Sequence, residues 1–309
     1  MFNQSKIKPN GWLAFEINVL RRLKFDVVIM PFAAQPTLGV HLKRWNVRVL
    51  ANDIMQSAWT KSVATIQNNA ETLSESDVNT ILEDAYVPRY RLQNAALRRW
   101  FNETDSWWFD NVRRNIEKLP TQATRAMALH LGMNVGDYAA SFTDETLELR
   151  QSFSKIYRRL WAAYSKPFDN SQDNLCLNKP ANEFVAEAAT AANLMFLRLP
   201  SVNYQNNFGG AARREEWIRG GDDFWTDLRV SSKGKFGVPV ETKSQYLQLF
   251  EDILQAAHKV PNWAIAHVED GFLTTQELVE TIGRVRRVDT IYSKDFSELT
   301  GTKAVIITA

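Results

Sequence analysis

The segment from Asp26 to Asp53 limits the choice of fold more than any other part of this sequence. It reads DVVIMPFAAQPTLGVHLKRWNVRVLAND, in which two short apolar runs flank a stretch with helical character. Two strands joined by a helix form a βαβ unit, and the strands of such a unit pair in parallel. The flanking segments WLAFEINVLRRL and DIMQSAWTKSVATI both have the apolar spacing of helices. The sequence therefore predicts an α/β domain with a parallel sheet, in which Asn52 or Asp53 caps the second flanking helix.

The strand signal disappears at about residue 73 and returns at about residue 171. Amphipathic helical segments fill the interval: SDVNTILEDAY, YRLQNAALRRWF, WWFDNVRRNIEKL, TQATRAMALHL and TDETLELRQSFSKIYRRLWAAYS. We therefore expect an α/β domain at 1–72 and 171–309, interrupted by an all-helical insert at 73–170. Strand signals resume at DNLCLN and NLMFLRL. The last two strands, RRVDTIYS and KAVIITA, are expected to pair as an antiparallel edge of a mostly parallel sheet.

Composition excludes several classes of protein. No apolar run approaches the roughly 20 residues of a membrane helix, and the N-terminus lacks the apolar core of a signal peptide. We therefore expect a cytoplasmic protein with no membrane partner. The single cysteine, Cys176, excludes an internal disulfide, and the four scattered histidines have no metal-ligand spacing. The net charge of +2 does not by itself indicate a nucleic-acid partner.

Three features carry a resemblance to a known family: the loop MPFAAQP after the first strand, Asn52-Asp53 after the second, and the late segment WAIAHVEDGFLTTQELVETIGRVRRV. Their order resembles the class I methyltransferase (Rossmann-like) fold. More narrowly, the chain from about Lys8 to Ala309 is similar to the Dam-like (D12 class) adenine-specific DNA methyltransferases. The resemblance implies S-adenosylmethionine as cofactor, DNA as substrate and partner, and a role in restriction-modification. The positions that match cofactor contacts are Pro31, Phe32, Ala33, Gln35, Asn52 and Asp53.

The cofactor loop departs from the family in the residues that matter for binding. Glycines in such a loop bring backbone amides close to the ligand and adopt positive φ, whereas Ala33, Gln35 and Pro36 stand at this place. Proline also has no amide proton to donate. Met30 replaces the acid that precedes Pro-Phe in the family. We therefore predict that this loop does not bind S-adenosylmethionine in the family's manner.

Asp53 keeps the chemistry of the family, and two interpretations stay open for it. Its carboxylate could accept hydrogen bonds from both ribose hydroxyls of the cofactor. It could equally cap the helix that starts at Ile54.

The catalytic motif of the family, Asp-Pro-Pro-Tyr, falls on Leu199, Pro200, Ser201 and Val202. Leucine accepts no hydrogen bond from the adenine amine, and valine has no ring on which a flipped base could stack. A register shifted by two residues gives Ser201, Val202, Asn203 and Tyr204, with a polar first residue and an aromatic fourth. This shifted register requires the strand to run through Pro200, and proline is unfavourable within an interior strand.

The expected insert places basic residues beside aromatic ones, a pattern typical of nucleic-acid surfaces. Tyr90, Trp100, Tyr157 and Trp161 are the aromatic residues. The candidate DNA-binding residues are Arg89, Arg91, Arg98, Arg99, Lys155, Arg158 and Arg159. Acidic residues lie close by in the sequence, so these basic residues also fit the ordinary solvated face of amphipathic helices.

Three hypotheses about function follow. The chain could be a homologue of DNA adenine methyltransferases with impaired or absent catalysis, a pseudoenzyme that keeps a role in binding DNA or a catalytic partner subunit. It could be an active DNA adenine methyltransferase with atypical motifs. It could also be a methyltransferase fold that acts on another substrate, although the sequence contains no dedicated constellation for one.

Overall fold

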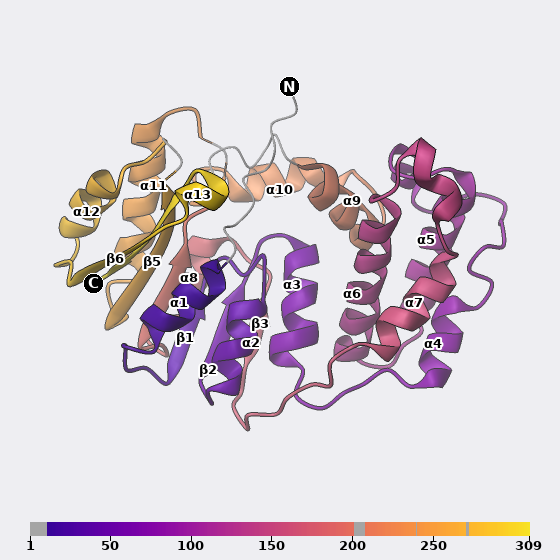
Figure 1. Ribbon diagram of the computed structural model, residues 1–309, viewed down its shortest axis with the longest axis horizontal. Helices are drawn as coiled ribbons and strands as arrows, with labels where there is room; N and C mark the ends of the chain where they lie inside the picture. The colour runs from indigo at the N-terminus through magenta and orange to yellow at the C-terminus, as the bar shows by residue number, and fades with distance from the viewer. Residues whose placement is uncertain (1–10, 201–207, 239, 270–271) are drawn as a thin grey trace. The chain divides into compact units, whose positions relative to one another are not determined.

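The computed structural model describes residues 11–200, 208–238, 240–269 and 272–309 (Figure 1). These residues form two compact units. The sheet unit contains the described residues up to Ile54, those from Gln172 to Pro200, and those from Val230 onward. The helical unit contains Met55–Ser171 together with Phe208–Arg229.

Seven strands of the sheet unit form one sheet, in the order β3-β2-β1-β4-β5-β7-β6. They are β1 (Val27–Met30), β2 (Arg48–Asn52), β3 (Leu175–Leu177), β4 (Leu194–Arg198), β5 (Asn262–Glu269), β6 (Thr290–Asp295) and β7 (Lys303–Thr308). The first five pair in parallel, and β7 runs antiparallel to both β5 and β6. This arrangement confirms the predicted fold class, including the antiparallel edge built by the last two strands.

The sheet is covered by helices on both faces, which is why its central strands are apolar almost throughout. The helices of this unit are α1 (Trp12–Leu20), α2 (Thr37–Arg44), α8 (Ala181–Ala188), α11 (Lys243–Ala256), α12 (Thr275–Gly283) and α13 (Ser297–Thr300). Alternate strand residues such as Ile29, Leu50 and Trp263 share one hydrophobic core with α8, α11 and α12. In Figure 1, α1 and α2 lie in front of the sheet and α8 and α11 lie behind it.

The helical unit is built from α-helices and short turns of other helix types. Its elements are α3 (Gln56–Ser62), the π-helical η1 (Val63–Gln67), α4 (Glu75–Leu82), η2 (Ala95–Arg99), α5 (Glu103–Ile116), α6 (Gln122–Ala139), η3 (Asp144–Leu149), α7 (Phe153–Ala162) and α9 (Phe208–Arg219). The helix α10 (Phe224–Ser232) spans the boundary between the two units. Trp108, Phe109 and Phe153 form an aromatic core with ring centroids 4.9 to 5.5 Å apart.

Two expected helices of this region are wrong in extent. The segment 143–165 does not form one helix: η3 is a 3-10 turn, Arg150 is extended, and α7 begins at Phe153. The Arg150 guanidinium makes two hydrogen bonds to the Asp105 carboxylate, at 2.7 and 2.9 Å, and this tertiary contact coincides with the break. In 90–101, only the 3-10 turn η2 forms. Local periodicity could not anticipate the break in 143–165, because the contact that coincides with it is distant in sequence.

The helix predicted from Ile54 begins later than expected and is capped differently. The N-cap of α3 is Met55, which makes no side-chain cap hydrogen bond. The first amides, Gln56 N and Ser57 N, instead donate to the Glu215 carboxylate at 2.7 and 2.8 Å. The prediction that Asn52 or Asp53 caps this helix is therefore wrong. α12, by contrast, begins with a capping box formed by Thr274 and Glu277.

The boundaries of the two units differ from the expected domain boundaries at 72 and 171. α3 and η1 belong to the helical unit, and so do the residues of α9, which come after the return of the strand signal. Whether the helical unit acts as an inserted recognition domain stays a prediction.

Helices α6 and α9 pack at very short range because α6 has glycine at the crossing. A Cβ on Gly132 would lie 2.1 Å from Cη2 of Trp217, which is too short for two non-bonded carbon atoms. Trp217 is buried, and its indole Nε1 donates to Phe109 O at 2.9 Å, so the ring is held in place. Four residues later, a Cβ on Gly136 would meet nothing closer than 3.6 Å.

We expect Gly132→Ala to destabilise the protein by about 1–3 kcal/mol, the usual range for overpacking a core. Gly136→Ala in the same helix is the matched control, and it should be neutral or slightly stabilising because alanine favours helices by up to about 1 kcal/mol over glycine. Urea unfolding monitored by circular dichroism measures both. Equal stability of the two variants would contradict this account of the crossing.

Candidate functional site

The candidate site lies at the carboxyl ends of β1, β2 and β4, in the sheet unit. Ligands of open α/β sheets bind in the crevice outside the carboxyl ends of the parallel strands. The loop Pro31–Pro36 follows β1, Asn52 ends β2 with Asp53 after it, and Leu199 follows β4. The structure therefore brings the sequence-predicted residues of the first loop, the end of the second strand, and Leu199 and Pro200 of the catalytic motif to one edge of the sheet.

Asn52 ties the backbone of three neighbouring loops together. Its amide nitrogen donates to Pro31 O at 3.2 Å and to Lys179 O at 3.0 Å, and its side-chain oxygen accepts from Lys179 N at 3.1 Å. Its backbone oxygen accepts from Ala33 N at 2.9 Å. Asn52 is buried, so these bonds satisfy polar groups that water does not reach. The Asn52 side chain thus holds the loop rather than facing an open site.

A buried ion pair lies at the same edge. Arg198, the last residue of β4, donates from Nε and Nη2 to the two carboxylate oxygens of Glu16 in α1, both at 2.6 Å. The Glu16 side chain is fully buried and the Arg198 side chain is 12% exposed. The third guanidinium nitrogen, Nη1, donates to Gln35 O at 3.4 Å. The pair connects α1 and β4 to the backbone of the loop that the resemblance assigns to the cofactor.

The aromatic residue of that loop is packed against another segment of the sheet unit. Gly237, which has a φ of +97°, approaches Phe32 so closely that a Cβ on the glycine would lie 2.5 Å from Cε1 of the ring. Phe236 contacts the same ring edge-on, with centroids 5.8 Å apart. Phe236 N donates to Asn182 Oδ1 at 3.0 Å, which fixes this segment to α8. Phe32 is therefore a packing residue between α2 and the chain before α11.

The start of the family's catalytic motif continues the strand. Leu199 N donates to Ala266 O at 3.0 Å, which extends the parallel ladder of β4 and β5 by one bond, and the Leu199 side chain packs on the hydrophobic core. The Tyr246 hydroxyl of α11 donates to Pro200 O at 2.9 Å. Ser201, Val202 and Tyr204, including the alternative register, lie outside the described residues.

The remaining residues of the cofactor set are Ala33, Gln35 and Asp53. Ala33 is buried, and Gln35 offers its backbone oxygen to Arg198. Asp53 is 4% exposed, and its backbone amide donates to Leu177 O at 3.2 Å. Asp53 thus stands at the carboxyl end of β2, as the resemblance requires.

Sequence reasoning missed Glu16, Arg198, Tyr246 and Gly237. One signal could have found the first two. Glu16 occupies a core position of α1, between the buried residues Phe15 and Val19, and Arg198 ends an otherwise apolar strand. A charged residue at a core position requires a partner of opposite charge.

The candidate DNA-binding residues have unequal surroundings in the helical unit. Lys155, Arg158 and Arg159 are exposed and follow the i, i+3, i+4 spacing, so they lie along one face of α7. Arg158 Nη2 contacts Asn79 Oδ1 at 2.7 Å and Arg159 Nη1 contacts Gln151 Oε1 at 3.3 Å, both neutral partners. These three side chains therefore keep their positive charge without a carboxylate partner in the described part of the chain.

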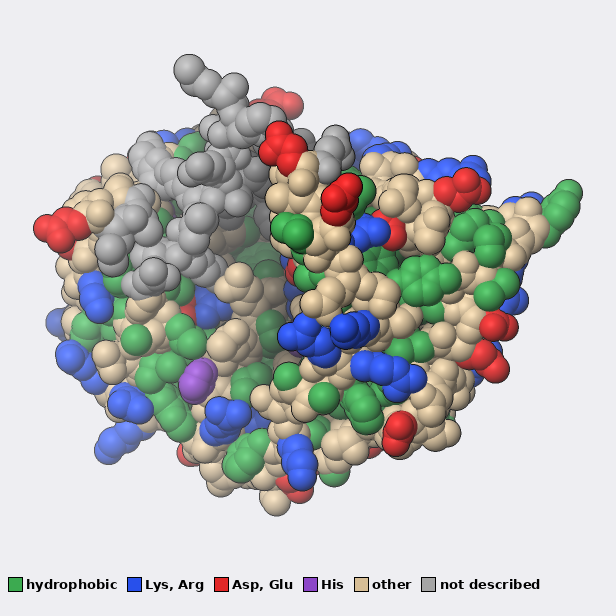
Figure 2. Space-filling model, turned by 45° about the vertical axis from the view of Figure 1, so that its right-hand side comes forward, with side chains coloured by type: hydrophobic (Ala, Val, Ile, Leu, Met, Phe, Trp, Pro, Cys, Tyr) green, Lys and Arg blue, Asp and Glu red, His purple; other side chains and the backbone are tan. Residues whose placement is uncertain are grey.

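Other members of the set act within the fold. Arg99 pairs with the buried Glu216 at 3.1 Å and with Asp222 at 2.9 Å. Arg89 Nε donates to Asn111 Oδ1 at 3.1 Å. In the space-filling view of Figure 2, small groups of Lys and Arg side chains alternate with acidic and hydrophobic ones. The charge on this face is therefore local rather than a continuous basic field.

Three of the four aromatic neighbours of these basic residues are buried or half-buried. Tyr157 is fully buried, and its hydroxyl donates to Ala128 O at 3.1 Å; burial raises the pKa of this phenol well above its usual value. Trp100 Nε1 donates to the Glu216 carboxylate at 2.6 Å, and Trp161 Nε1 donates to Leu73 O at 3.0 Å. The expectation that these three rings contribute surface for stacking is wrong for Tyr157, and the other two are half-buried.

Burial also removes one possible positive charge. It lowers the pKa of His130 to about 4, and the nearby Lys61 acts in the same direction. The His130 ring is therefore neutral at neutral pH and adds nothing to the charge of the helical unit. Its Nδ1 lies 3.1 Å from the hydroxyl of Tyr164, whose pKa burial raises to about 12.

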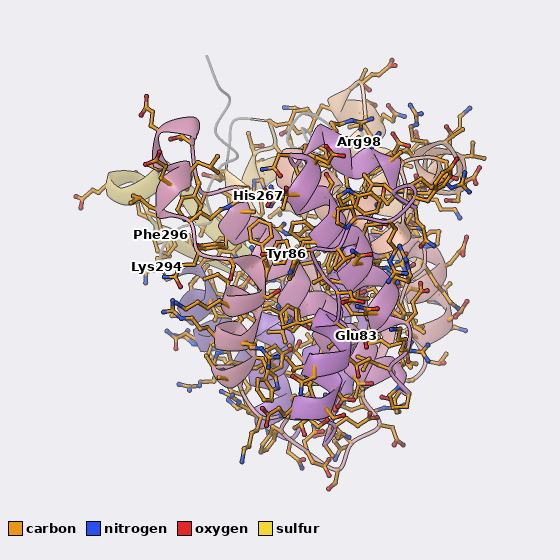
Figure 3. The ribbon with its side chains drawn as sticks, turned by 90° about the vertical axis from the view of Figure 1, so that its right-hand side faces the viewer. Glu83, Tyr86, Arg98, His267, Lys294 and Phe296 are labelled. Atoms are coloured by element: carbon orange, nitrogen blue, oxygen red, sulfur yellow. The ribbon has the colours of Figure 1, made fainter. Side chains whose placement is uncertain are left out.

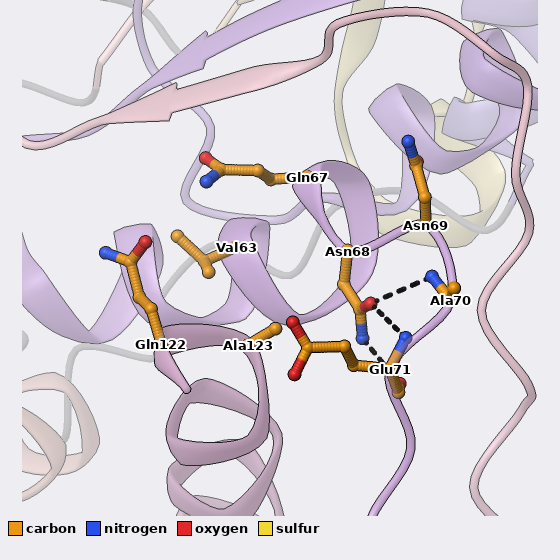
Figure 4. A pocket seen from close by; sticks show the side chains of 8 residues that line it. All are labelled: Val63, Gln67, Asn68, Asn69, Ala70, Glu71, Gln122 and Ala123. Atoms are coloured by element: carbon orange, nitrogen blue, oxygen red, sulfur yellow. Dashed lines mark hydrogen bonds between the residues drawn. The ribbon is translucent and has the colours of Figure 1, made fainter. Parts of the chain in front are cut away.

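A pocket of about 320 Å³ lies beside η1 in the helical unit (Figure 4). Asn68 lines it, but its side-chain oxygen accepts from Ala70 N and Glu71 N at 3.2 and 2.9 Å, and its amide donates to Glu71 O at 2.9 Å. These bonds use the Asn68 amide to close a turn. Glu71 is the charged residue of the lining, and it accepts a short hydrogen bond from Thr121 Oγ1. We assign no function to this pocket.

The described residues contain no cluster of three or more His, Cys, Asp or Glu side chains that could hold a metal ion. They also contain no helix long and apolar enough to cross a membrane.

The strand order, with one antiparallel strand next to the edge, defines the class I methyltransferase-like, Rossmann-like α/β fold. No protein-family model matches the chain. The chain has distant similarity, 24% identity over 315 aligned residues, to the protein named Type II methyltransferase M2.HphI from Haemophilus parahaemolyticus. The match covers 93% of this chain and 88% of that protein, so it includes both units.

Because the Glu16–Arg198 pair is buried, we expect Glu16→Gln to destabilise the protein by about 3–5 kcal/mol, since it leaves the guanidinium uncompensated. The double variant Glu16→Leu with Arg198→Met removes both charges and should be more stable than Glu16→Gln. Chemical denaturation gives the free energies of unfolding.

Glu187→Gln is the matched control, because it breaks an ion pair with Lys179 whose side chains are 55% and 36% exposed. Such surface pairs contribute about 0–1 kcal/mol. If Glu16→Gln lost no more stability than Glu187→Gln, the pair would not organise this edge.

Proposed function

We propose that this chain is a homologue of DNA methyltransferases that binds duplex DNA through its helical unit and does not bind S-adenosylmethionine in the manner of the Dam-like family. The observation that carries the proposal is the contact of Arg198, paired with Glu16, on the backbone of the loop after β1. The chain's own groups occupy the edge at which the family holds its cofactor and target base.

The residues at this edge do not fit the cofactor as the family binds it. S-adenosylmethionine carries a positive sulfonium and a positive amine, which the family's acid before Pro-Phe helps to hold. Met30 stands at that position and is 1% exposed. The nearby Glu16 carboxylate is already neutralised by Arg198. Ala33 N is bonded to Asn52 O, and Pro36, the N-cap of α2, has no amide hydrogen.

The base-binding side supports the same proposal. The family holds the adenine amine through a side-chain oxygen and a proline carbonyl. Here the first position is Leu199, which packs on the core, and the carbonyl of Pro200 accepts a hydrogen bond from Tyr246. This bond uses one of the two lone pairs of the carbonyl oxygen and leaves one for an amine proton.

The helical unit supplies the support for DNA binding. The exposed face of α7 carries Lys155, Arg158 and Arg159, which fit phosphate groups at helical spacing. The distant similarity to a protein named as a type II methyltransferase agrees with DNA as the partner. A catalytic partner subunit would supply the chemistry that this chain lacks.

A second function is favoured by one observation: the similarity covers nearly the full length of both proteins, and Asp53 keeps its place after β2. On this basis the chain would be an active DNA adenine methyltransferase of a restriction-modification system with atypical motifs. A methyl-transfer assay on unmethylated genomic DNA distinguishes the two functions, because only the second predicts incorporation of labelled methyl groups.

We expect isothermal titration of the purified protein with S-adenosylmethionine to give no binding in the micromolar range. The physical reason is the loss of the acid and of the free backbone amides in the loop after β1. Thermal denaturation with and without 1 mM cofactor, taken as about 1,000 times a micromolar Kd, should show no shift, whereas such binding would stabilise the protein by about 4 kcal/mol. A micromolar dissociation constant would refute the cofactor part of the proposal.

We expect the protein to bind mixed-sequence duplex DNA with an affinity that falls steeply with salt. Replacement of Lys155, Arg158 and Arg159 by alanine should lower the magnitude of the slope of log K against log salt concentration by up to about 2.7, if each side chain contacts one phosphate. Fluorescence anisotropy between about 50 and 200 mM salt, a range over which the Debye length falls by about half, measures the slope.

The control replaces three exposed basic residues of the sheet unit, Lys24, Lys259 and Arg287, by alanine and should leave the slope nearly unchanged. Failure of the wild-type protein to bind duplex DNA at about 50 mM salt, where phosphate contacts are strong, would make the helical unit a docking surface for another protein instead.

A further inference from the structure

Tyr90 is the most exposed large hydrophobic side chain of the described residues, with a relative exposure of 102%. It lies in the loop between α4 and η2, where Val87, Pro88, Arg89 and Arg91 are also exposed. A tyrosine ring in an ordinary surface loop lies against its neighbours and buries part of its apolar area. Full exposure of the ring therefore requires a loop that holds it away from the protein.

Both ends of this loop are anchored by buried side chains of α5. The amide nitrogen of Asn111 donates to Asp84 O, Ala85 O and Val87 O at 3.0 to 3.2 Å, before the tip. After the tip, Gln93 N and Asn94 N donate to the Asp110 carboxylate at 3.1 and 2.9 Å. The fold thus uses two adjacent buried residues of one helix to fix the loop on either side of Tyr90.

A further contact joins the loop to the helix that carries the basic face. The hydroxyl of Tyr86, which Figure 3 labels, accepts a hydrogen bond from Phe153 N at 2.7 Å. Phe153 is the first residue of α7, and Lys155 follows two residues later. Burial raises the pKa of Tyr86, so its hydroxyl stays protonated at neutral pH. The base of the Tyr90 loop therefore lies beside the first turn of α7.

Three arginines lie close to Tyr90 in the sequence. Arg91, in the loop, and Arg98, in η2 and labelled in Figure 3, are exposed and make no ion pair or hydrogen bond with the described residues. Arg89 uses Nε to bond Asn111 and leaves its two terminal nitrogens unpaired in the described part of the chain. Guanidinium groups pair with phosphates, and an aromatic ring provides a stacking surface for a base.

We propose that Tyr90 is a base-stacking residue: its ring inserts against a nucleobase of bound DNA while Arg91 and Arg98 contact the neighbouring phosphates. This inference rests on the proposed function and adds to it a residue that contacts a base of the DNA rather than its sugar-phosphate backbone. The anchored loop lowers the entropy lost when the ring is ordered on the ligand, because the backbone around it is already fixed. Tyrosine and arginine are also frequent at protein–protein hot spots, so a protein partner is the competing occupant that the experiment must separate.

The experiment compares wild-type protein, Tyr90→Ala and Tyr90→Phe on mixed-sequence duplexes that contain 2-aminopurine at successive positions. The fluorescence of 2-aminopurine reports changes in its stacking. We expect wild-type protein and Tyr90→Phe to change the fluorescence at one or a few positions, and Tyr90→Ala to lose that change. The dissociation constant of Tyr90→Ala should rise about 5- to 150-fold, because a base–aromatic stack contributes about 1–3 kcal/mol.

The salt dependence separates the ring from the charges. Tyr90→Ala should keep the wild-type salt slope, since the ring releases no counterions, whereas Arg91→Ala with Arg98→Ala should lower its magnitude by up to about 1.8. Phe168→Ala is the matched control, because Phe168 is an exposed aromatic residue of the same unit, 45% exposed. It should change neither the affinity nor the fluorescence. Because Tyr90 is fully exposed, its replacement should leave the unfolding midpoint unchanged.

The outcomes are distinct. DNA binding by wild-type protein that Tyr90→Ala matches in affinity and fluorescence would overturn this inference and leave the proposed function standing. Absence of DNA binding by the wild-type protein would overturn both, and the exposed ring would then be assigned to a protein interface. Loss of the 2-aminopurine signal in Tyr90→Ala alone, with retention in Tyr90→Phe, supports the stacking role.

Discussion

The carboxyl edge of a parallel sheet ends in polar backbone groups that must find hydrogen-bond partners, and in this protein the chain itself supplies them. Asn52 joins the loops after β1, β2 and β3, and Arg198 with Glu16 joins β4, α1 and the loop backbone at Gln35. Tyr246 satisfies the carbonyl of Pro200. In an enzyme of this fold, a ligand takes up part of this bonding capacity. Here internal contacts use part of it, and the loop after β1 depends on them.

The charged residues of the helical unit fall into two groups, those that are buried and paired and those that are exposed. Buried acids organise the helices: Glu215 caps α3, and Glu216 accepts from Trp100, Trp225 and Arg99. A buried carboxylate needs such a set of donors, because desolvation otherwise disfavours its charge. The arginines that serve these acids are structural. The basic residues of α7, together with Arg91 and Arg98, do not pair with these acids, so their positive charge is available to a partner.

Much of the fold and part of the site could be predicted. Apolar runs and helical spacing place β1, β2, β4 and β5 close to their observed positions, since strands buried on both faces are continuously apolar. The apolar run of β2 also predicts that Asn52 and Asp53 lie at the end of this strand, at the edge of the sheet. The single helix expected at 143–165 and the cap of α3 could not be predicted, because Asp105 and Glu215 determine them from 45 and about 160 residues away.

The sequence by itself determined the fold class, an α/β domain whose mostly parallel sheet has an antiparallel edge. It also determined that Met30, Ala33, Gln35 and Pro36 stand in place of the family's acid and glycines. These are local properties, set by periodicity and by the chemistry of single side chains. Only the tertiary structure decided which polar groups find one another. It pairs Arg198 with Glu16 over 182 positions, brings Tyr246 to Pro200, buries the ring of Tyr157 and leaves that of Tyr90 in solvent. The physical reason is that charge pairing and burial depend on distance in space, which residue spacing along the chain does not fix.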